Sequence, residues 1–234
     1  MKKFYALFAL ALLLPLNSFA KTFANQFIEF QLPDKWECQL DGTEWVCQST
    51  DEQKKRDAII VLAAKIKKAG MDELTVYKAH LEKAQTYQSL SGESITSEPR
   101  YVKELEIQGK QWIDSLHLQS EIPDFYTRYL ATVEADLGIL VTFSVRKDKY
   151  EEYMPDIENM VKSLRAFRKP GEINTTGDSP VGDPNATLFP EGDGTGPGKK
   201  PKQGGGGGAE IAVLLLLLAA AGGGFIIWKK KQKR

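Results

Sequence analysis

Two cysteines, nine residues apart, carry the strongest chemical signal in this sequence. Cys38 and Cys47 are the only cysteines among 234 residues. If Gly42-Thr43 forms a two-residue hairpin loop with glycine first, these cysteines face each other at a non-hydrogen-bonded position, within disulfide reach. A competing turn at Asp41-Gly42 would place Cys38 opposite Trp45 and leave both thiols unpaired. We therefore predict a Cys38–Cys47 disulfide across a β-hairpin, with two buried free thiols as the alternative.

The histidines give no catalytic or metal-binding constellation. His80 falls in a predicted helix and His117 in a predicted strand. No Gly-x-Ser-x-Gly elbow, His-Glu-x-x-His pair, phosphate-binding loop or dinucleotide-binding fingerprint follows a predicted strand. With so few histidine and cysteine side chains, we expect no metal, no cofactor and no enzymatic activity. A hydrolase with an unrecognised site is the remaining enzymatic alternative.

Polar side chains on the predicted sheet form one candidate binding patch. Side chains alternate between faces along each strand, so polar residues of neighbouring strands can meet on one face. If the register brings them together, one face of the sheet carries Glu104, Glu106, His117, Tyr126 and Arg128. Such a patch could hold a ligand, and ordinary cross-strand pairing is the alternative.

The hydrophobic pattern predicts a mixed fold for the segment that carries these residues. Short turns join most of the predicted strands, which favours an antiparallel sheet. Leu74, Tyr77 and Leu81 recur at helical spacing, and a longer apolar stripe runs from Tyr150 to Leu164, where Pro155 either lies in the first turn or divides a short turn from the main helix. The expected strands are 27–32, 58–66, 101–107, 111–119, 125–134 and 138–145, and the expected helices are 72–90 and 150–164. Two helices on a sheet of five to seven strands make an α+β layered domain.

Several segments of this domain resemble one known family. The opening segment Phe30-Gln-Leu-Pro-Asp-Lys-Trp36 is similar to the F-x-x-P-x-x-W strand of PsbP-like domains, including bacterial DcrB-type periplasmic relatives. The similarity continues through the segments 57–61, 71–77, 138–144 and 157–164. The resemblance implies an α-β-α sandwich with an antiparallel sheet, and a non-enzymatic role as an accessory or binding module. The cysteine hairpin is not a hallmark of that family.

The N-terminal residues have the layout of a secretory signal. Two lysines precede an apolar run of 13 residues, which is too short to span a bilayer comfortably. Ser18 and Ala20 supply small side chains for cleavage between Ala20 and Lys21. We expect residues 1–20 to be removed, leaving an exported domain at 21–168.

The C-terminal residues predict a membrane anchor. After a Gly/Pro-rich flexible linker at 169–208, an apolar segment at 209–228 is long enough for one transmembrane helix, and 229–234 is a basic tail. The positive-inside rule places that tail in the cytoplasm, so the protein is expected as a single-pass type I protein of the bacterial inner membrane, with its domain in the periplasm. The same three-part pattern resembles sorting tails that proteases remove, which would instead place the protein at the cell surface.

The charge distribution argues against nucleic acid as a partner. The 31 basic and 31 acidic residues balance, but seven of the basic residues lie at the two ends. The remaining chain is acidic, whereas binding to phosphate backbones needs a basic surface. We expect a membrane-tethered, exported accessory domain that binds a protein or cell-envelope component, with a small-ligand-binding module as the alternative.

Overall fold

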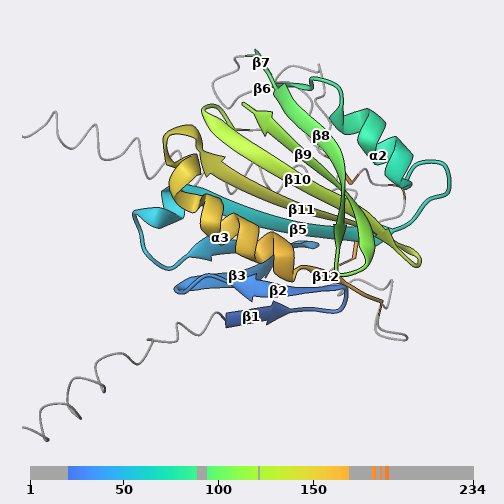
Figure 1. Cartoon of the computed structure of the whole chain (residues 1–234), viewed down its shortest axis with the longest axis horizontal. Helices are drawn as coiled ribbons and strands as arrows, with labels where there is room; N and C mark the ends of the chain where they lie inside the picture. The colour runs from blue at the N-terminus through green and yellow to red at the C-terminus, as the bar shows by residue number, and fades with distance from the viewer. Residues whose placement is uncertain are drawn as a thin grey trace, which may run out of the picture.

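A computed structural model describes residues 21–88, 94–120, 122–168, 181–182, 185 and 188–189 (Figure 1). The expected signal at 1–20, the transmembrane helix at 209–228, the tail at 229–234 and most of the linker at 169–208 lie outside these residues. Within the described ranges, no helix combines the length and the hydropathy needed to cross a membrane.

The domain is built around one seven-stranded antiparallel sheet with the strand order β3-β4-β5-β11-β10-β9-β8. Its strands are β3 (Trp36–Asp41), β4 (Glu44–Ser49), β5 (Ala58–Ile66), β8 (Glu98–Ile107), β9 (Lys110–Leu118), β10 (Phe125–Glu134) and β11 (Leu137–Arg146). The expected strand at 58–66 is confirmed at both ends. Its apolar run from Ala58 to Ala64 suits a central strand covered on both faces, because along this run neither face needs polar residues.

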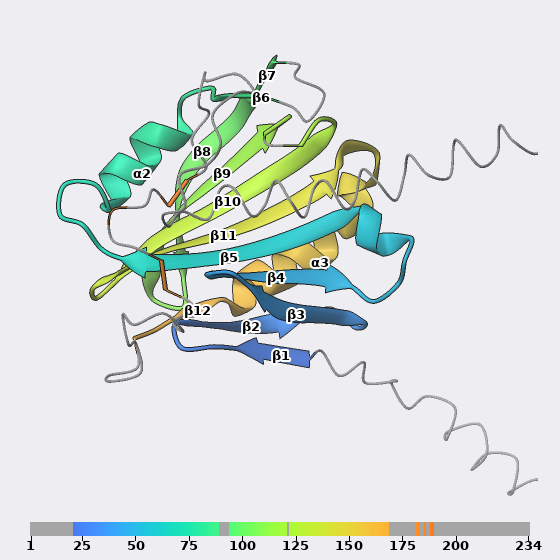
Figure 2. The same cartoon turned by 180° about the vertical axis from the view of Figure 1, so that it is seen from behind.

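The remaining elements cover the two faces of this sheet. They are the strands β1 (Lys21–Ala24), β2 (Ile28–Leu32), β6 (Thr86–Gln88), β7 (Ser94–Thr96) and β12 (Arg165–Ala166), the helices α2 (Leu74–Leu81) and α3 (Tyr150–Ser163), and the short 3-10 helices η2 (Lys54–Arg56) and η3 (Lys147–Lys149). Helix α3 and the three-stranded sheet β1-β2-β12 lie on one face, and α2 lies on the other (Figures 1 and 2).

Alternation along the strands supplies a core for each face. In β11, Val141 and Phe143 belong to the cluster beneath α3, whereas Leu140 belongs to the cluster beneath α2. The first cluster is the larger and includes the fully buried Trp112. The predicted α+β fold with an antiparallel sheet is therefore confirmed. Each face carries a single α-helix among the described residues, so the helical layers of the expected sandwich are sparse.

The predicted hairpin register is confirmed residue by residue. Leu40 pairs with Trp45, Cys38 pairs with Cys47, and the two cysteines form a disulfide. Gly42 has a positive φ of 59°, which glycine adopts readily as the first residue of a two-residue loop. The face of the hairpin that carries the cysteines is core at its base, where Cys47 is fully buried, but Leu40 near the tip is 45% exposed.

Loss of this disulfide is expected to lower the free energy of unfolding by about 2.5–3 kcal/mol, because the bond restricts the conformations of the unfolded chain. This value corresponds to a closed loop of about ten residues. Urea unfolding of the purified protein should show the difference between the native protein and a Cys38→Ser/Cys47→Ser variant. A reducing agent should lower the unfolding midpoint of the native protein and leave the midpoint of the variant unchanged. Equal sensitivity of both proteins would contradict the prediction.

Three predicted elements differ from the structure. The helix expected at 72–90 ends at Leu81, and Thr86–Gln88 forms strand β6 instead, because those residues pair with β7. The strand expected at 27–32 is present as β2 but pairs with β1 and β12 rather than joining the large sheet. Pro155 lies inside α3, in its second turn, where it neither starts the helix nor divides it.

Part of the predicted flexible linker lies on the folded domain. Gly182 donates its backbone N–H to the carbonyl of Ala64 at 2.8 Å, and Leu188 and Phe189 are each 8% exposed. The prediction of a solvated coil is therefore wrong at these residues. Leu188 and Phe189 are large and apolar, and they pack in the hydrophobic cluster that includes Tyr77 and Leu81 of α2.

Candidate functional site

The polar patch expected on one sheet face is divided between two faces. His117 pairs with Thr127, so its side chain lies on the same face of the sheet as Thr127. Arg128 is the next residue of β10, so its side chain lies on the other face. Glu104 and Glu106 lie on the same side as His117, facing α2, whereas Tyr126 and Arg128 face α3. The alternation along each strand was predicted correctly, but the assumption that the register brings these faces together was wrong. A one-residue shift sends every side chain of a strand to the opposite face.

On the α3 face, Arg128 is part of a buried ion-pair network. Its Nε and Nη2 donate to the two carboxylate oxygens of Asp114, each at 2.8 Å, and its Nη1 donates to Glu158 at 2.7 Å. Burial alone would lower the pKa of Arg128, but hydrogen bonds and charge from Asp114 outweigh it and raise that pKa. Arg128 is 3% exposed and therefore contributes to the core rather than to a surface patch.

On the α2 face, His117 is enclosed and fully hydrogen-bonded. Its Nε2 lies 2.9 Å from the carbonyl of Leu81, which can only accept, so Nε2 carries the proton. Its Nδ1 accepts from the hydroxyl of Ser97 at 3.3 Å. Burial lowers the pKa of His117 to about 4, so the ring is neutral near pH 7. A neutral, satisfied histidine joining α2 to the sheet is a structural residue.

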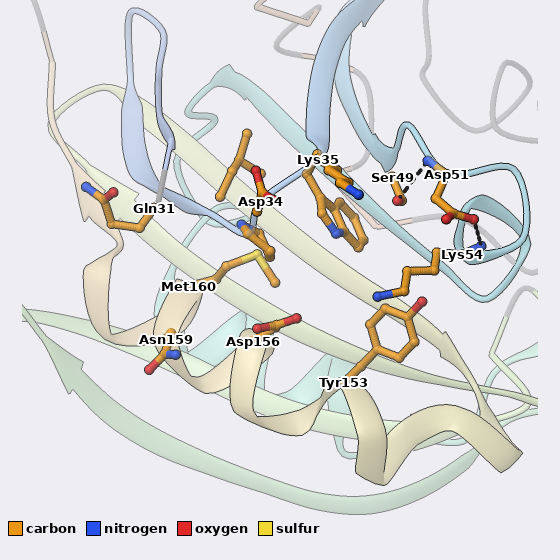
Figure 3. Close-up of a pocket in the computed structure, with 13 residues that line it drawn as sticks. Gln31, Asp34, Lys35, Ser49, Asp51, Lys54, Tyr153, Asp156, Asn159 and Met160 are labelled. Atoms are coloured by element: carbon orange, nitrogen blue, oxygen red, sulfur yellow. Dashed lines mark hydrogen bonds between the residues drawn. The ribbon is translucent and has the colours of Figure 1, made fainter. Parts of the chain in front are cut away.

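The strongest candidate for a binding site is a cleft between α3 and the turn that joins β2 to β3 (Figure 3). Its volume is about 520 Å³, within the range of sites that hold small molecules or groups of side chains. Three stretches of chain line it, namely the segment 31–36, the end of β4 with the η2 region, and one side of α3. The lining residues are Gln31, Leu32, Pro33, Asp34, Lys35, Trp36, Ser49, Asp51, Lys54, Tyr153, Asp156, Asn159 and Met160.

Backbone hydrogen bonds fix the two loops that form one wall of the cleft. Thr50 donates its N–H to the carbonyl of Lys35 at 2.7 Å, which ties the β2–β3 turn to the end of β4. Lys35 has a φ of 61°, an uncommon conformation for a residue with a side chain. The carboxylate of Asp51 accepts the N–H of Gln53 at 2.9 Å and the N–H of Lys54 at 3.3 Å. The loop on the η2 side is therefore held in place before any ligand binds.

The floor of the cleft is apolar and its rim is charged. Trp36, Met160 and Leu32 are almost completely buried and form the floor. At the rim, α3 contributes Asp156 and Asn159, and the opposite wall carries Asp34, Lys35, Asp51 and Lys54 (Figure 3). A buried apolar floor inside a polar rim is the arrangement found at the centre of many protein interfaces, where the rim keeps water from the anchor group.

One polar atom of the cleft wall has no partner. The hydroxyl of Tyr153 is buried and makes no hydrogen bond with any residue that the structure describes. Burial, together with the nearby carboxylates of Asp57, Glu152 and Asp156, raises the pKa of Tyr153 to about 12. The hydroxyl therefore stays protonated near neutral pH. Five other side chains of the described residues also carry a buried polar atom without a partner, and Tyr153 is the one among them that lines the cleft.

The cleft is better suited to binding than to catalysis. The backbone N–H groups of Gln53 and Lys54 lower the pKa of Asp51, so its carboxylate is an acceptor rather than a proton donor near neutral pH. Ser49 accepts the N–H of Asp51 through its hydroxyl at 3.2 Å, and no histidine lines the cleft to activate it. Across the described ranges, no group of three or more His, Cys, Asp or Glu side chains could hold a metal ion.

Sequence reasoning did not identify this cleft, although one signal was available. The segment Phe30–Trp36, which carried the resemblance to PsbP-like domains, forms one wall of the cleft through Gln31 to Trp36. The opposite wall comes from α3, more than a hundred residues later in the chain. Only the tertiary fold brings these segments together.

Comparison with known proteins adds only a general likeness of fold. No protein-family model matches the sequence, and no curated protein matches it. Similar solved structures include the cyanobacterial PsbP of Synechocystis (12% identity, 65% of this chain, 95% of that chain, TM-score 0.46) and the Ran-binding protein Mog1p of Saccharomyces cerevisiae (9%, 62%, 95%, 0.41). LpqN of Mycobacterium tuberculosis, involved in cell envelope biogenesis, is also similar (11%, 64%, 87%, 0.34). At these values the likeness concerns the general path of the chain and does not bear on function.

Proposed function

We propose that this chain is a non-enzymatic binding module, exported and tethered to the bacterial inner membrane, whose cleft beside α3 holds part of a protein or cell-envelope partner. The observation that carries the proposal is the cleft of about 520 Å³, with its buried aromatic floor, its mixed-charge rim and the unpartnered hydroxyl of Tyr153. The expected leader at 1–20 and the expected anchor at 209–228 supply the location.

The chemistry of the cleft describes the group that it would bind. An apolar side chain or ring could pack against Trp36 and Met160, and an oxygen atom beside it could accept a hydrogen bond from the hydroxyl of Tyr153. Flanking charges of both signs would meet Lys54 on one wall and Asp156 on the other. A polypeptide segment with one apolar anchor between polar neighbours satisfies all of these contacts. The volume of the cleft also admits a small molecule, which is the second candidate.

Reversing the two rim charges in a Lys54→Glu/Asp156→Lys variant is expected to weaken partner binding by about tenfold or more, because each reversed side chain would then repel the group that it contacted. A photo-crosslinking residue at the exposed position Asn159 would report binding in cells. We expect a discrete crosslinked product that the double variant loses. A large product would identify a protein partner, and a small increase in mass would identify a small ligand.

A matched control is available on the other side of the domain. Glu82 and Lys83 are exposed near α2 and do not line the cleft, so Glu82→Lys/Lys83→Glu makes the same pair of charge reversals without touching the site. The control should crosslink as the native protein does. Products of equal yield in the native protein, the control and the double variant would refute the binding role of the cleft.

The location has a separate test, which is the intact mass of the protein extracted gently from its own cells without reduction. A mass that corresponds to residues 21–234, less two hydrogens, is expected for a tethered protein with a cleaved leader and a disulfide. A mass that ends within 204–208 would show a processed tail and place the binding function at the cell surface.

A further inference from the structure

A second groove lies on the opposite face of the sheet, at the C-terminal end of β5. Strand β4 pairs with β5 only as far as Leu62, so β4 does not cover the edge of β5 beyond that residue. The other edge of β5 is fully paired with β11. A strand end of this kind presents backbone groups to which an extended peptide can add.

Residues of the chain itself occupy this edge. Gly182 forms a parallel bridge with Lys65 and donates its N–H to the carbonyl of Ala64 at 2.8 Å. Asn185 accepts a hydrogen bond from the ammonium group of Lys68 at 3.4 Å. Val181, Gly182, Asn185, Leu188 and Phe189 are together called the strap. Figure 2 shows its described parts in orange beside the end of β5 and beside α2.

The strap ends in two apolar anchors beside α2. The ring of Phe189 stacks on His80, with 4.6 Å between centroids, and meets Tyr77 edge-on at 5.3 Å. Leu188 lies against Gly138, where an added Cβ would be 3.6 Å from its side chain. Both anchors are nearly buried. Backbone pairing at one end and buried side chains at the other are the two components of peptide recognition by strand addition.

The groove is larger than the strap requires. A cavity of about 220 Å³ remains beside Leu188 and Phe189, and its lining includes Met71 and Val76. These two side chains are 39% and 38% exposed, and they are two of the three large apolar residues that are exposed in the described part of the chain. At the base of the cavity, the ion pair between Lys65 and Asp72, at 2.7 Å, is itself buried. The unfilled part of the groove is therefore apolar at its rim and suits a further apolar side chain.

We propose that this groove is a peptide-binding site that the strap occupies in cis, and that an extended peptide from a partner displaces the strap. The peptide would pair with the end of β5, place a leucine and an aromatic residue where Leu188 and Phe189 lie, and fill the 220 Å³ cavity with one more apolar group. The strap is joined to the domain by only the residues 169–180, so its effective concentration at the groove is on the order of millimolar. A partner peptide must overcome this advantage.

The test measures binding of a fluorescent peptide with the sequence of residues 180–191 to the purified full chain. The native protein should bind it weakly because its own strap competes. A Leu188→Ala/Phe189→Ala variant, whose strap has lost both anchors, should bind it at least tenfold more tightly. Gly182→Pro offers a second route, since proline removes the N–H that bonds to Ala64 and leaves the groove intact.

Two controls identify the site of peptide binding. A peptide with alanine at both anchor positions should not bind. Adding His80→Ala to the Leu188→Ala/Phe189→Ala variant removes the stacking partner of Phe189 and should reduce binding by about tenfold. The proposal is overturned if the native protein and both strap variants bind the peptide equally, or if none of them binds it. The charge-reversed cleft variant should bind as its parent does, which separates this proposal from the function of the α3 cleft.

Discussion

Arg128→Ala is expected to lower the free energy of unfolding by about 3–5 kcal/mol. The guanidinium of Arg128 is paired with both carboxylate oxygens of Asp114, and both side chains are almost completely buried. Removing the cation leaves a buried carboxylate without its main partner. Lys103, whose ammonium lies 3.4 Å from Asp114, already pairs with that carboxylate and can compensate in part. The loss should therefore fall toward the lower end of the range.

The control removes both charges together. In an Arg128→Met/Asp114→Leu variant no fully buried charge is left unpaired, because Glu158 and Lys103, which lose a partner, are partly exposed. Most of the lost stability should therefore return, since apolar replacements of a buried ion pair are often neutral or stabilising. Urea unfolding, followed through tryptophan fluorescence, measures both variants. If Arg128→Ala unfolds within about 0.5 kcal/mol of the native protein, or if the double variant is no more stable than the single one, the ion pair does not contribute as stated.

Acidification from pH 7 to pH 4 is expected to cost about 3 kcal/mol of stability through His117 alone. The pKa of His117 falls from an ordinary value of 6.5 in the unfolded chain to about 4 in the folded protein, chiefly because the ring is buried. Between these values the unfolded chain binds the proton and the folded protein does not. Stability therefore decreases as the pH falls from about 6.5 to about 4, and this contribution is fully lost below that window.

His117→Gln isolates this contribution from that of the carboxylates. A glutamine can still donate to the carbonyl of Leu81 and accept from Ser97, but it has no charge to gain. Urea midpoints at pH 7, 5.5 and 4 should fall more steeply for the native protein than for the variant. His80 lies close enough to disfavour a charge on His117, so His80→Ala should raise the pKa of His117 slightly and make the decline of stability on acidification shallower. Parallel profiles for the native protein and His117→Gln would refute the assignment.

The success of the hairpin prediction and the failure of the patch prediction have one physical origin. In the hairpin, a two-residue loop fixes the register, so every pair follows from the position of Gly42. Strands β9 and β10 are joined by the longer segment 119–124, in which Gln119 and Asp124 both have positive φ. A loop of that length is compatible with more than one register. The sequence specifies the face of each residue within a strand, but the tertiary fold decides which faces coincide.

The burial of charged residues could likewise not be predicted from the sequence. Asp72 lies just before a predicted helix, and from the sequence alone it is interpreted as an exposed acidic residue that favours the start of that helix. In the structure Asp72 is buried and forms an ion pair with Lys65. Its Oδ1 accepts a hydrogen bond from the hydroxyl of Tyr77, with 3.0 Å between the two oxygens. The α3 cleft was missed for a similar reason, since its walls come from segments far apart in the chain. The strap was missed because its few apolar residues lie in a polar, Gly/Pro-rich segment and give too weak a periodic signal.

The pairing of β5 with β11 at the centre of the large sheet determines the order in which the molecule can fold. This ladder joins residue 58 to residue 145 and residue 66 to residue 137, whereas β8, β9, β10 and β11 pair with their nearest neighbours in the chain. Closing a long loop is entropically unfavourable, so such contacts form late. The hairpins can appear early during synthesis, but the central ladder and both cores must wait until β11 has emerged. A chain with that property remains unfolded for most of its synthesis, which is the state that passage through a membrane channel requires.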